Sequence, residues 1–151
     1  MDLIIRRAKP ADAPTLVTFN TAMALETEDK RLSPERLGAG VQALLRDATK
    51  GFYLVSVQPD STIVGQLMVT FEWSDWRNAW FWWIQSVYVA PAARRSGIYR
   101  GLHDRVISLA REDGTVCGVR LYVHHDNARA QRTYEAMGMS RAHYELFEVD
   151  L

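Results

Sequence analysis

The fold of this chain is decided by the stretch Ile84–Arg100, which reads IQSVYVAPAARRSGIYR. It begins as an apolar run typical of a buried strand, passes through a turn at Pro91, and leads into a helix from Gly97. The residues that follow predict this helix, because apolar side chains recur on one of its faces: Ile98, Leu102, Val106, Leu109 and Ala110. A strand–turn–helix unit therefore lies at the centre of the fold.

The start of this helix is suited to an anion. Backbone N–H groups in the first turn lack partners within the helix, and the helix dipole is positive there. Gly97 lets a ligand oxygen approach the backbone, and Arg94 and Arg95 add positive charge. The run predicts a phosphate or pyrophosphate site, and the alternative is an ordinary turn with solvated arginines.

A second segment has a similar organisation. Residues 119–123 predict a strand, and a turn follows in which Asp126 or Asn127 can cap a helix. Residues 128–137 predict that helix, which Gly138 ends.

These two segments resemble the motifs of the GNAT superfamily of N-acyltransferases. The first, Arg-x-x-Gly-x-(Gly/Ala), is Arg94–Tyr99 here, with Tyr99 where the family has Gly or Ala, so that its side chain must point away from the ligand. The second, Asn-x-x-Ala-x-x-x-Tyr before a Gly-Met turn, is represented by Asn127, Ala130, Tyr134, Gly138 and Met139. The two motifs stand in the family's order, and the resemblance covers nearly the whole chain.

The resemblance implies a single GNAT-like domain over residues 1–151, of class α/β, with a mixed, mostly antiparallel, twisted sheet flanked by helices. It implies acetyl-CoA as cofactor. The residues that it places around the cofactor are Val87, Tyr88, Val89, Arg94, Arg95, Ser96, Gly97, Ile98, Tyr99, Asn127, Ala130 and Tyr134.

Hydrophobic periodicity and turn residues predict the remaining elements. Strands are expected at residues 3–7, 51–57, 63–73, 79–89, 118–124 and 141–150. Helices are expected from Asp12, as N-cap, and from Ser33, then at 97–113 and 128–137.

Acyl transfer to an amine needs a group that accepts the proton of the amine and an acid that protonates the departing thiolate. Tyr134 lies at the family's general-acid position, although a Tyr on a helix can also be a core residue. Glu72, at the end of a strand, is the leading candidate for the base. Gln85 lies where many relatives carry a carboxylate and is expected to orient a water. Glu26 and Glu28, in the connection between the first two helices, are expected to wall the acceptor site and are alternative bases.

All five tryptophans lie between residues 73 and 83. One interpretation is that Trp82 and Trp83 point to opposite faces of the sheet and fill the core. The other is that the segment Trp73, Asp75, Trp76 and Arg77 shapes the acceptor site, because aromatic faces and a carboxylate attract a cationic amine. Both interpretations can hold, for different tryptophans.

Composition narrows the function classes. The chain has 151 residues, of which 48% are hydrophobic, and this suits one domain with a sizeable core. Because its formal net charge is zero, neither nucleic acid nor a membrane surface is an expected partner. One cysteine, Cys117, excludes an intrachain disulfide, and there is no signal-peptide pattern, which favours the cytoplasm.

No metal site is expected at His124-His125-Asp126, because adjacent histidines at a strand end point apart. No Gly-x-Gly-x-x-Gly follows an early strand, which argues against a dinucleotide oxidoreductase.

The prediction is an N-acetyltransferase that transfers acetyl directly from acetyl-CoA to a primary amine of a small molecule. The alternatives are a non-catalytic acyl-CoA sensor, which Gln85 keeps open, and a protein or peptide N-acetyltransferase. Apolar side chains in the last expected strand, between Tyr144 and Leu151, suggest pairing in a homodimer.

Overall fold

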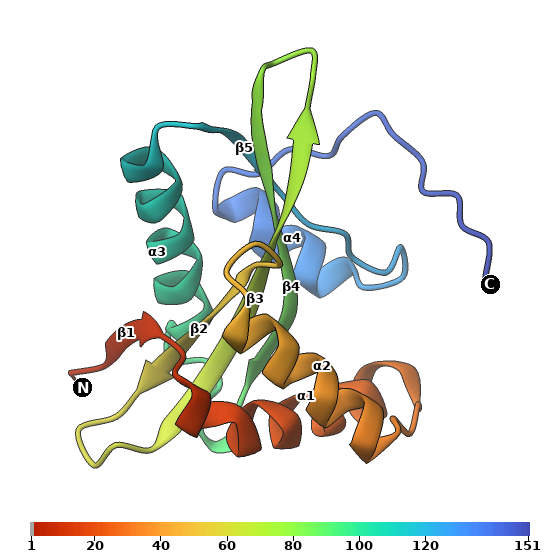
Figure 1. Cartoon of the computed structure of the whole chain (residues 1–151). Helices are drawn as coiled ribbons and strands as arrows, with labels where there is room; N and C mark the ends of the chain where they lie inside the picture. The colour runs from red at the N-terminus through yellow and green to blue at the C-terminus, as the bar shows by residue number, and fades with distance from the viewer. Residues whose placement is uncertain (1) are drawn as a thin grey trace. The chain divides into compact units, whose positions relative to one another are not determined.

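The computed structural model describes residues 2–151 and contains one five-stranded sheet (Figure 1). The strands lie in sequence order: β1 (Ile4–Arg7), β2 (Phe52–Val57), β3 (Ile63–Ser74), β4 (Ala79–Val89) and β5 (Val116–Arg120). Neighbouring strands are antiparallel except β4 and β5, which are parallel. The predicted mixed, mostly antiparallel sheet is therefore confirmed.

Four α-helices accompany the sheet in the described residues: α1 (Ala13–Glu28), α2 (Pro34–Arg46), α3 (Ile98–Asp113) and α4 (Ala128–Ala136). Short 3₁₀ turns lie at Pro10–Asp12 and Pro91–Ala93. The chain forms two compact units, Met1–Leu121 and Tyr122–Leu151. The first contains the sheet and α1–α3, and the second contains α4.

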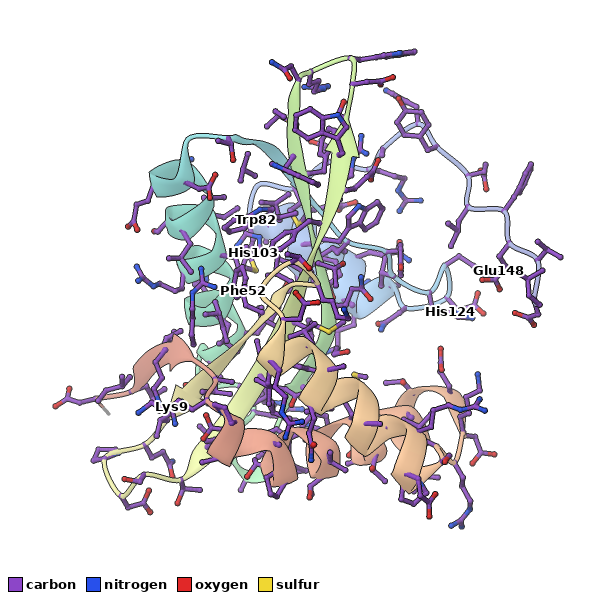
Figure 2. All side chains as sticks on the ribbon, in the orientation of Figure 1. Lys9, Phe52, Trp82, His103, His124 and Glu148 are labelled. Carbon is purple, nitrogen blue, oxygen red and sulfur yellow. The ribbon has the colours of Figure 1, made fainter. Side chains whose placement is uncertain are left out.

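Each face of the sheet has its own core. The face toward α3 buries Phe52, Val69 and Trp82 against Leu102 and Val106. Figure 2 shows Phe52 and Trp82 there together, with their ring centroids 5.3 Å apart. The face toward α1 and α2 buries alternate residues of β2 with the apolar sides of the two helices: Tyr53, Val55, Leu16, Val41 and Leu44. Alternate side chains of β2 thus pack against the helices on the two faces of the sheet, which explains why the strand is buried throughout.

A β-bulge interrupts β4. Gln66 pairs with Tyr88 and Met68 pairs with Gln85, so β4 has one residue more than β3 between these pairs. Ser86 adopts a left-handed φ of 52°, and its carbonyl accepts a hydrogen bond from Nε2 of the fully buried Gln66 at 3.0 Å. Because a bulge bends its strand, β4 turns at this point.

The structure corrects several local expectations. No strand forms at residues 141–150, and β5 ends at Arg120 rather than 124. Asp12 occupies the N-cap position of α1 as expected, but its side chain does not cap the helix: the carboxylate accepts hydrogen bonds from the Arg6 guanidinium at 2.7 Å and from the Lys9 N–H. The predicted Ser33 cap is confirmed, since its Oγ accepts the Arg36 N–H.

Within residues 2–151, no helix has both the length and the apolar character needed to cross a membrane.

Candidate active site

The loop before α3 has the backbone of an anion site. Arg95 and Gly97 both adopt left-handed conformations, with φ of 65° and 78°. Gly97 is the N-cap of α3, and no side chain caps the helix. A Cβ at Gly97 would meet no atom within 4 Å. The helix start is thus open to a ligand, with N–H groups in its first turn directed outward.

The neighbouring half of β4 has an open edge. Its last pair with β5 is Trp83 with Arg120, and β4 continues to Val89 with no described strand beyond that point on this side. The unpaired backbone of residues 85–89 can donate and accept hydrogen bonds to an extended ligand. An open strand edge beside an uncapped helix start fits an acyl-CoA, which has an amide-bearing arm and a pyrophosphate.

Arg94 is engaged within the protein. Its Nη2 donates to Glu26 Oε2 at 2.8 Å, and its Nε donates to the Val89 carbonyl at 2.9 Å. The Tyr88 hydroxyl donates to Glu26 Oε1 at 3.2 Å, and burial together with the Glu26 charge raises the pKa of Tyr88. Glu26 and Glu28 lie in the last turn of α1 rather than in the connection after it. Glu26 therefore lies beside the loop before α3 and offsets the charge of Arg94.

The other residues of the first motif have distinct positions. Ile98 is buried in the core beneath α3, and the half-buried Tyr99 packs against the same core. Ser96 Oγ donates to the Ala93 carbonyl at 2.5 Å, which closes the turn. The motif thus presents its backbone to solvent and turns its large side chains inward.

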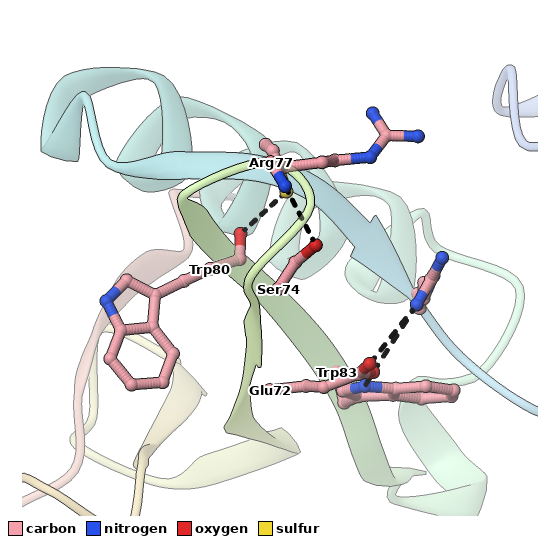
Figure 3. A network of polar contacts seen from close by, with 7 residues as sticks. Glu72, Ser74, Arg77, Trp80 and Trp83 are labelled. Atoms are coloured by element: carbon pink, nitrogen blue, oxygen red, sulfur yellow. Dashed lines mark hydrogen bonds and ion pairs between the residues drawn. The ribbon is translucent and has the colours of Figure 1, made fainter.

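Glu72 forms an ion pair with Arg120 (Figure 3). Alternation along β3 puts its side chain on the same face as Met68, which packs against the core under α1 and α2. Oε1 of Glu72 accepts a hydrogen bond from the Trp83 indole at 2.7 Å and lies 3.4 Å from Nη1 of Arg120. The Arg120 guanidinium lies over the Phe81 ring, 3.5 Å from its centroid. The sequence does not point to Arg120, because nothing along the chain specifies the register of β5 against β4.

Gln85 lies on the same face, two residues along β4 from Trp83. Its Nε2 donates to the Thr70 hydroxyl at 2.6 Å. With the amide nitrogen held in this way, the amide oxygen is the group that can accept from a water or an amine. The structure thus places Glu72 and Gln85 on one face of the sheet, along with two residues that sequence patterns did not single out, Thr70 and Arg120.

The structure separates the hairpin residues Trp73, Asp75, Trp76 and Arg77 from Glu26. They lie at the tip of the β3–β4 hairpin, at the end of the sheet away from α1 (Figure 1). Trp76 is 93% exposed, and Trp73 stacks edge-on against Trp80 with centroids 4.9 Å apart. The interpretation of Trp82 and Trp83 is confirmed in part: the two point to opposite faces, and Trp82 is buried in the core toward α3, whereas Trp83 is half-buried and donates to Glu72.

The second motif lies in the unit Tyr122–Leu151. The Asn127 side chain caps α4, accepting the Ala130 N–H at 3.1 Å, and Gly138 adopts a left-handed φ of 91° after the helix. Tyr134 is half-buried, and burial raises its pKa. A phenol with a raised pKa keeps its proton at neutral pH, as a general acid must.

The turn before α4 differs from its expected geometry. The His124 and His125 rings stack with centroids 4.6 Å apart instead of pointing to opposite sides. His125 Nε2 lies 3.4 Å from the Asp126 carboxylate, and all three side chains are exposed. The reason is that these residues form a turn, in which side chains do not alternate as they do in a strand.

Comparisons with known proteins agree with this architecture. Residues 18–139 match the model of the acetyltransferase (GNAT) family. No curated protein matches the chain. A possible acetyltransferase from Clostridium difficile 630 is 42% identical, with a TM-score of 0.93 over 99% of this chain and 97% of that one.

Two more distant structures share the fold. An acetyltransferase from Trypanosoma brucei is 23% identical, with a TM-score of 0.74 over 99% of this chain and 100% of that one. A predicted acetyltransferase from Clostridium acetobutylicum, crystallised with acetyl-CoA, is 17% identical, with a TM-score of 0.79 over 99% and 96%. The chain is therefore an acyltransferase that belongs to the GNAT acetyltransferase family.

Proposed function

We propose that this enzyme transfers an acetyl group from acetyl-CoA to a primary amine of a small molecule. The observation that supports this most is the uncapped start of α3 beside the unpaired edge of β4. Together they supply hydrogen-bond donors for a pyrophosphate and a template for an extended amide-bearing arm.

The cofactor would be held mainly by backbone groups. The N–H groups of Gly97 and the first turn of α3 would bind the pyrophosphate, with Arg95 beside them. The backbone of Val87 and Val89 would bind the arm, and Asn127 would meet it from the second motif. When bound, the cofactor supplies an acetyl group activated as a thioester.

The reaction needs two proton transfers, and a different residue carries out each of them. The amine nitrogen must lose a proton as it bonds to the acetyl carbon, and Glu72 takes this proton directly or through a water on the Gln85 amide oxygen. The carbon–sulfur bond of the thioester would break in the same reaction, and Tyr134 would give its hydroxyl proton to the leaving thiolate. Glu72 is also paired with Arg120, so Glu26 and Glu28 remain the alternative bases.

A thiol-release assay with acetyl-CoA and a panel of amines, aminoglycosides and Lys-containing peptides tests this function. We expect turnover with small amines and less with peptides. Binding of acetyl-CoA without turnover on any acceptor would instead support a sensor, and faster turnover on peptides would support a peptide N-acetyltransferase.

The role of Glu72 can be tested separately. Glu72→Gln should lower the rate most at low pH, where the amine is protonated and needs a base. A pH–rate profile that overlays that of the parent would place the base elsewhere, with Glu26 and Glu28 as the next variants.

We also propose that the enzyme is a homodimer. Residues 147–151, Phe-Glu-Val-Asp-Leu, alternate apolar and acidic side chains as an amphipathic strand does, yet they form no strand. Phe147 is 94% exposed, and Val149 and Leu151 are exposed as well. A second copy of the chain would supply the pairing partner that such a strand requires.

A further inference from the structure

The ion pair between Glu72 and Arg120 extends across the sheet. Glu72 is on β3 and Arg120 is on β5, while Trp83 lies between them on β4 and binds the carboxylate. The Glu72 side chain is 44% exposed and that of Arg120 is 29% exposed. Two opposite charges are thus held on the same face as Gln85.

The ion pair between Glu72 and Arg120 is long. Arg120 reaches both Glu72 oxygens through one nitrogen, Nη1, at 3.4 and 3.5 Å. Close guanidinium–carboxylate pairs are shorter, about 2.7–2.9 Å, and often use two nitrogens. A contact of this length is more easily exchanged for another carboxylate than a close bidentate pair would be.

Arg120 nevertheless has a second contact that holds it in place. The central carbon of its guanidinium lies 3.5 Å from the centroid of the Phe81 ring, a cation–π contact that does not involve Glu72. Because a guanidinium binds planar carboxylates through its N–H groups, Arg120 can keep this position while its anionic partner changes.

The distance to Gln85 sets the size of the ligand. Arg120 pairs in register with Trp83, and Gln85 is two residues further along β4. Two residues of a strand span roughly 6–7 Å, and the Arg120 guanidinium lies over Phe81, on the other side of Trp83 from Gln85. An amine at the Gln85 amide oxygen and a carboxylate at Arg120 would therefore be separated by several bonds.

We propose that the acceptor carries a carboxylate as well as the primary amine, with the two groups separated by a short chain. Arg120 binds the acceptor's carboxylate in exchange for Glu72. Glu72, released from the pair, is then available to the ammonium group together with Gln85. This inference rests on the proposed function, and it names the substrate class that Arg120 selects.

The test compares matched acceptors in the acetyl-CoA assay. Glycine, β-alanine, 4-aminobutyrate and 5-aminopentanoate are each paired with the alkylamine that lacks the carboxylate. For the longer members we expect kcat/KM to favour the amino acid at least about 10-fold, the size of a charged hydrogen bond. Arg120→Gln should reduce this ratio to near one, and Arg120→Lys should restore part of it.

Arg77 provides the control, because its guanidinium also faces the Phe81 ring, at 5.3 Å, without contacting Glu72. Arg77→Gln should leave the ratio unchanged. If alkylamines and amino acids are acetylated equally by the parent, the inference is wrong and the proposed function stands. If neither class is acetylated although acetyl-CoA binds, the proposed function itself fails.

Discussion

Arg94 and Glu26 are 68 positions apart in the chain, and their side chains are joined by a hydrogen bond of 2.8 Å. The bond ties the loop before α3 to the last turn of α1. The first motif arginine is thus oriented by a carboxylate from another element, and its charge is partly neutralised beside the site proposed for a polyanion. The same carboxylate accepts from Tyr88, so the three side chains form one network.

Removing the Glu26 charge should strengthen CoA binding. In Glu26→Gln the positive charge of Arg94 is no longer offset, and affinity measured by calorimetry should rise about 2- to 5-fold at low salt, with less gain at high salt. Glu28→Gln makes the same charge change in the same helical turn and should have a smaller effect. Loss of affinity in Glu26→Gln would show that Glu26 mainly holds the loop in place.

Substitution of Gly97 should weaken CoA binding. Gly97 and Gly114 lie at opposite ends of α3, share a φ of 78°, and have open space at Cβ. Gly97→Val and Gly114→Val should therefore lose similar stability, about 1–2 kcal/mol. Only Gly97→Val blocks the outward N–H groups, so CoA affinity should fall at least about 10-fold in that variant alone. If calorimetry gave the two variants equal affinities for CoA, the pyrophosphate would not bind at this loop.

Tyr134→Phe should lower turnover and leave CoA affinity and melting temperature near those of the parent. It removes the proposed acid but keeps the ring, and a loss of about 100-fold in kcat is typical of such a role. Because burial raises the pKa of Tyr134, the parent's rate should hold to unusually alkaline pH. Tyr144→Phe is the control, and full activity in Tyr134→Phe would make its hydroxyl dispensable.

His103 should make the fold sensitive to acid. It is 3% exposed on α3, and neither ring nitrogen has a hydrogen-bond partner among the described residues (Figure 2). Burial lowers its pKa and outweighs the opposite effect of the Asp104 carboxylate, which lies 3.8 Å from Nδ1. Below about pH 6.5 the unfolded chain takes up a proton that the folded state resists, so stability is complete above that pH and declines as pH falls.

His103→Leu removes both the titrating group and the unpaired nitrogens. The variant should gain about 1 kcal/mol at pH 7 and lose less stability than the parent between pH 6.5 and 5, as measured by urea unfolding. His143→Gln, at an exposed position, should keep the parent's pH dependence. An unchanged pH dependence in His103→Leu would assign the acid sensitivity to other groups.

Phe147→Asp should convert the proposed dimer to a monomer. It places a charge on the apolar side of residues 147–151, where pairing with a second copy would bury it. Light scattering after size exclusion should give twice the chain mass for the parent and for Glu148→Gln, and the chain mass for Phe147→Asp. A monomeric parent would contradict the proposal.

Sequence patterns predicted most elements because their signals are local. Ser33 before Pro34, the Gly97 helix start and Gly138 after α4 each specify a boundary through backbone chemistry. The expected strand at 141–150 did not form, because a strand also needs a partner, and alternation along one segment cannot supply it.

The site was predictable only where it depends on the backbone. Gly97 could be recognised from its motif, whereas the partners of Glu72 and Arg94 depend on the register of β5 and on the course of α1. The extra residue at the bulge in β4 also leaves no mark in the sequence, since Ser86 is an ordinary strand residue apart from its φ.

That extra residue shifts the alternation of side chains between the two faces of β4 by one position. Gln85 and Tyr88 are three positions apart, so their side chains would point to opposite faces in a regular strand. Here both lie on the same face as their partners on β3, Met68 and Gln66. Tyr88 thereby meets Phe19 and Glu26 on α1, while Val87 and Val89 reach the core under α3. Deleting a single residue here would exchange these two sets and disconnect the Arg94 network, so the length of this strand is as constrained as its composition.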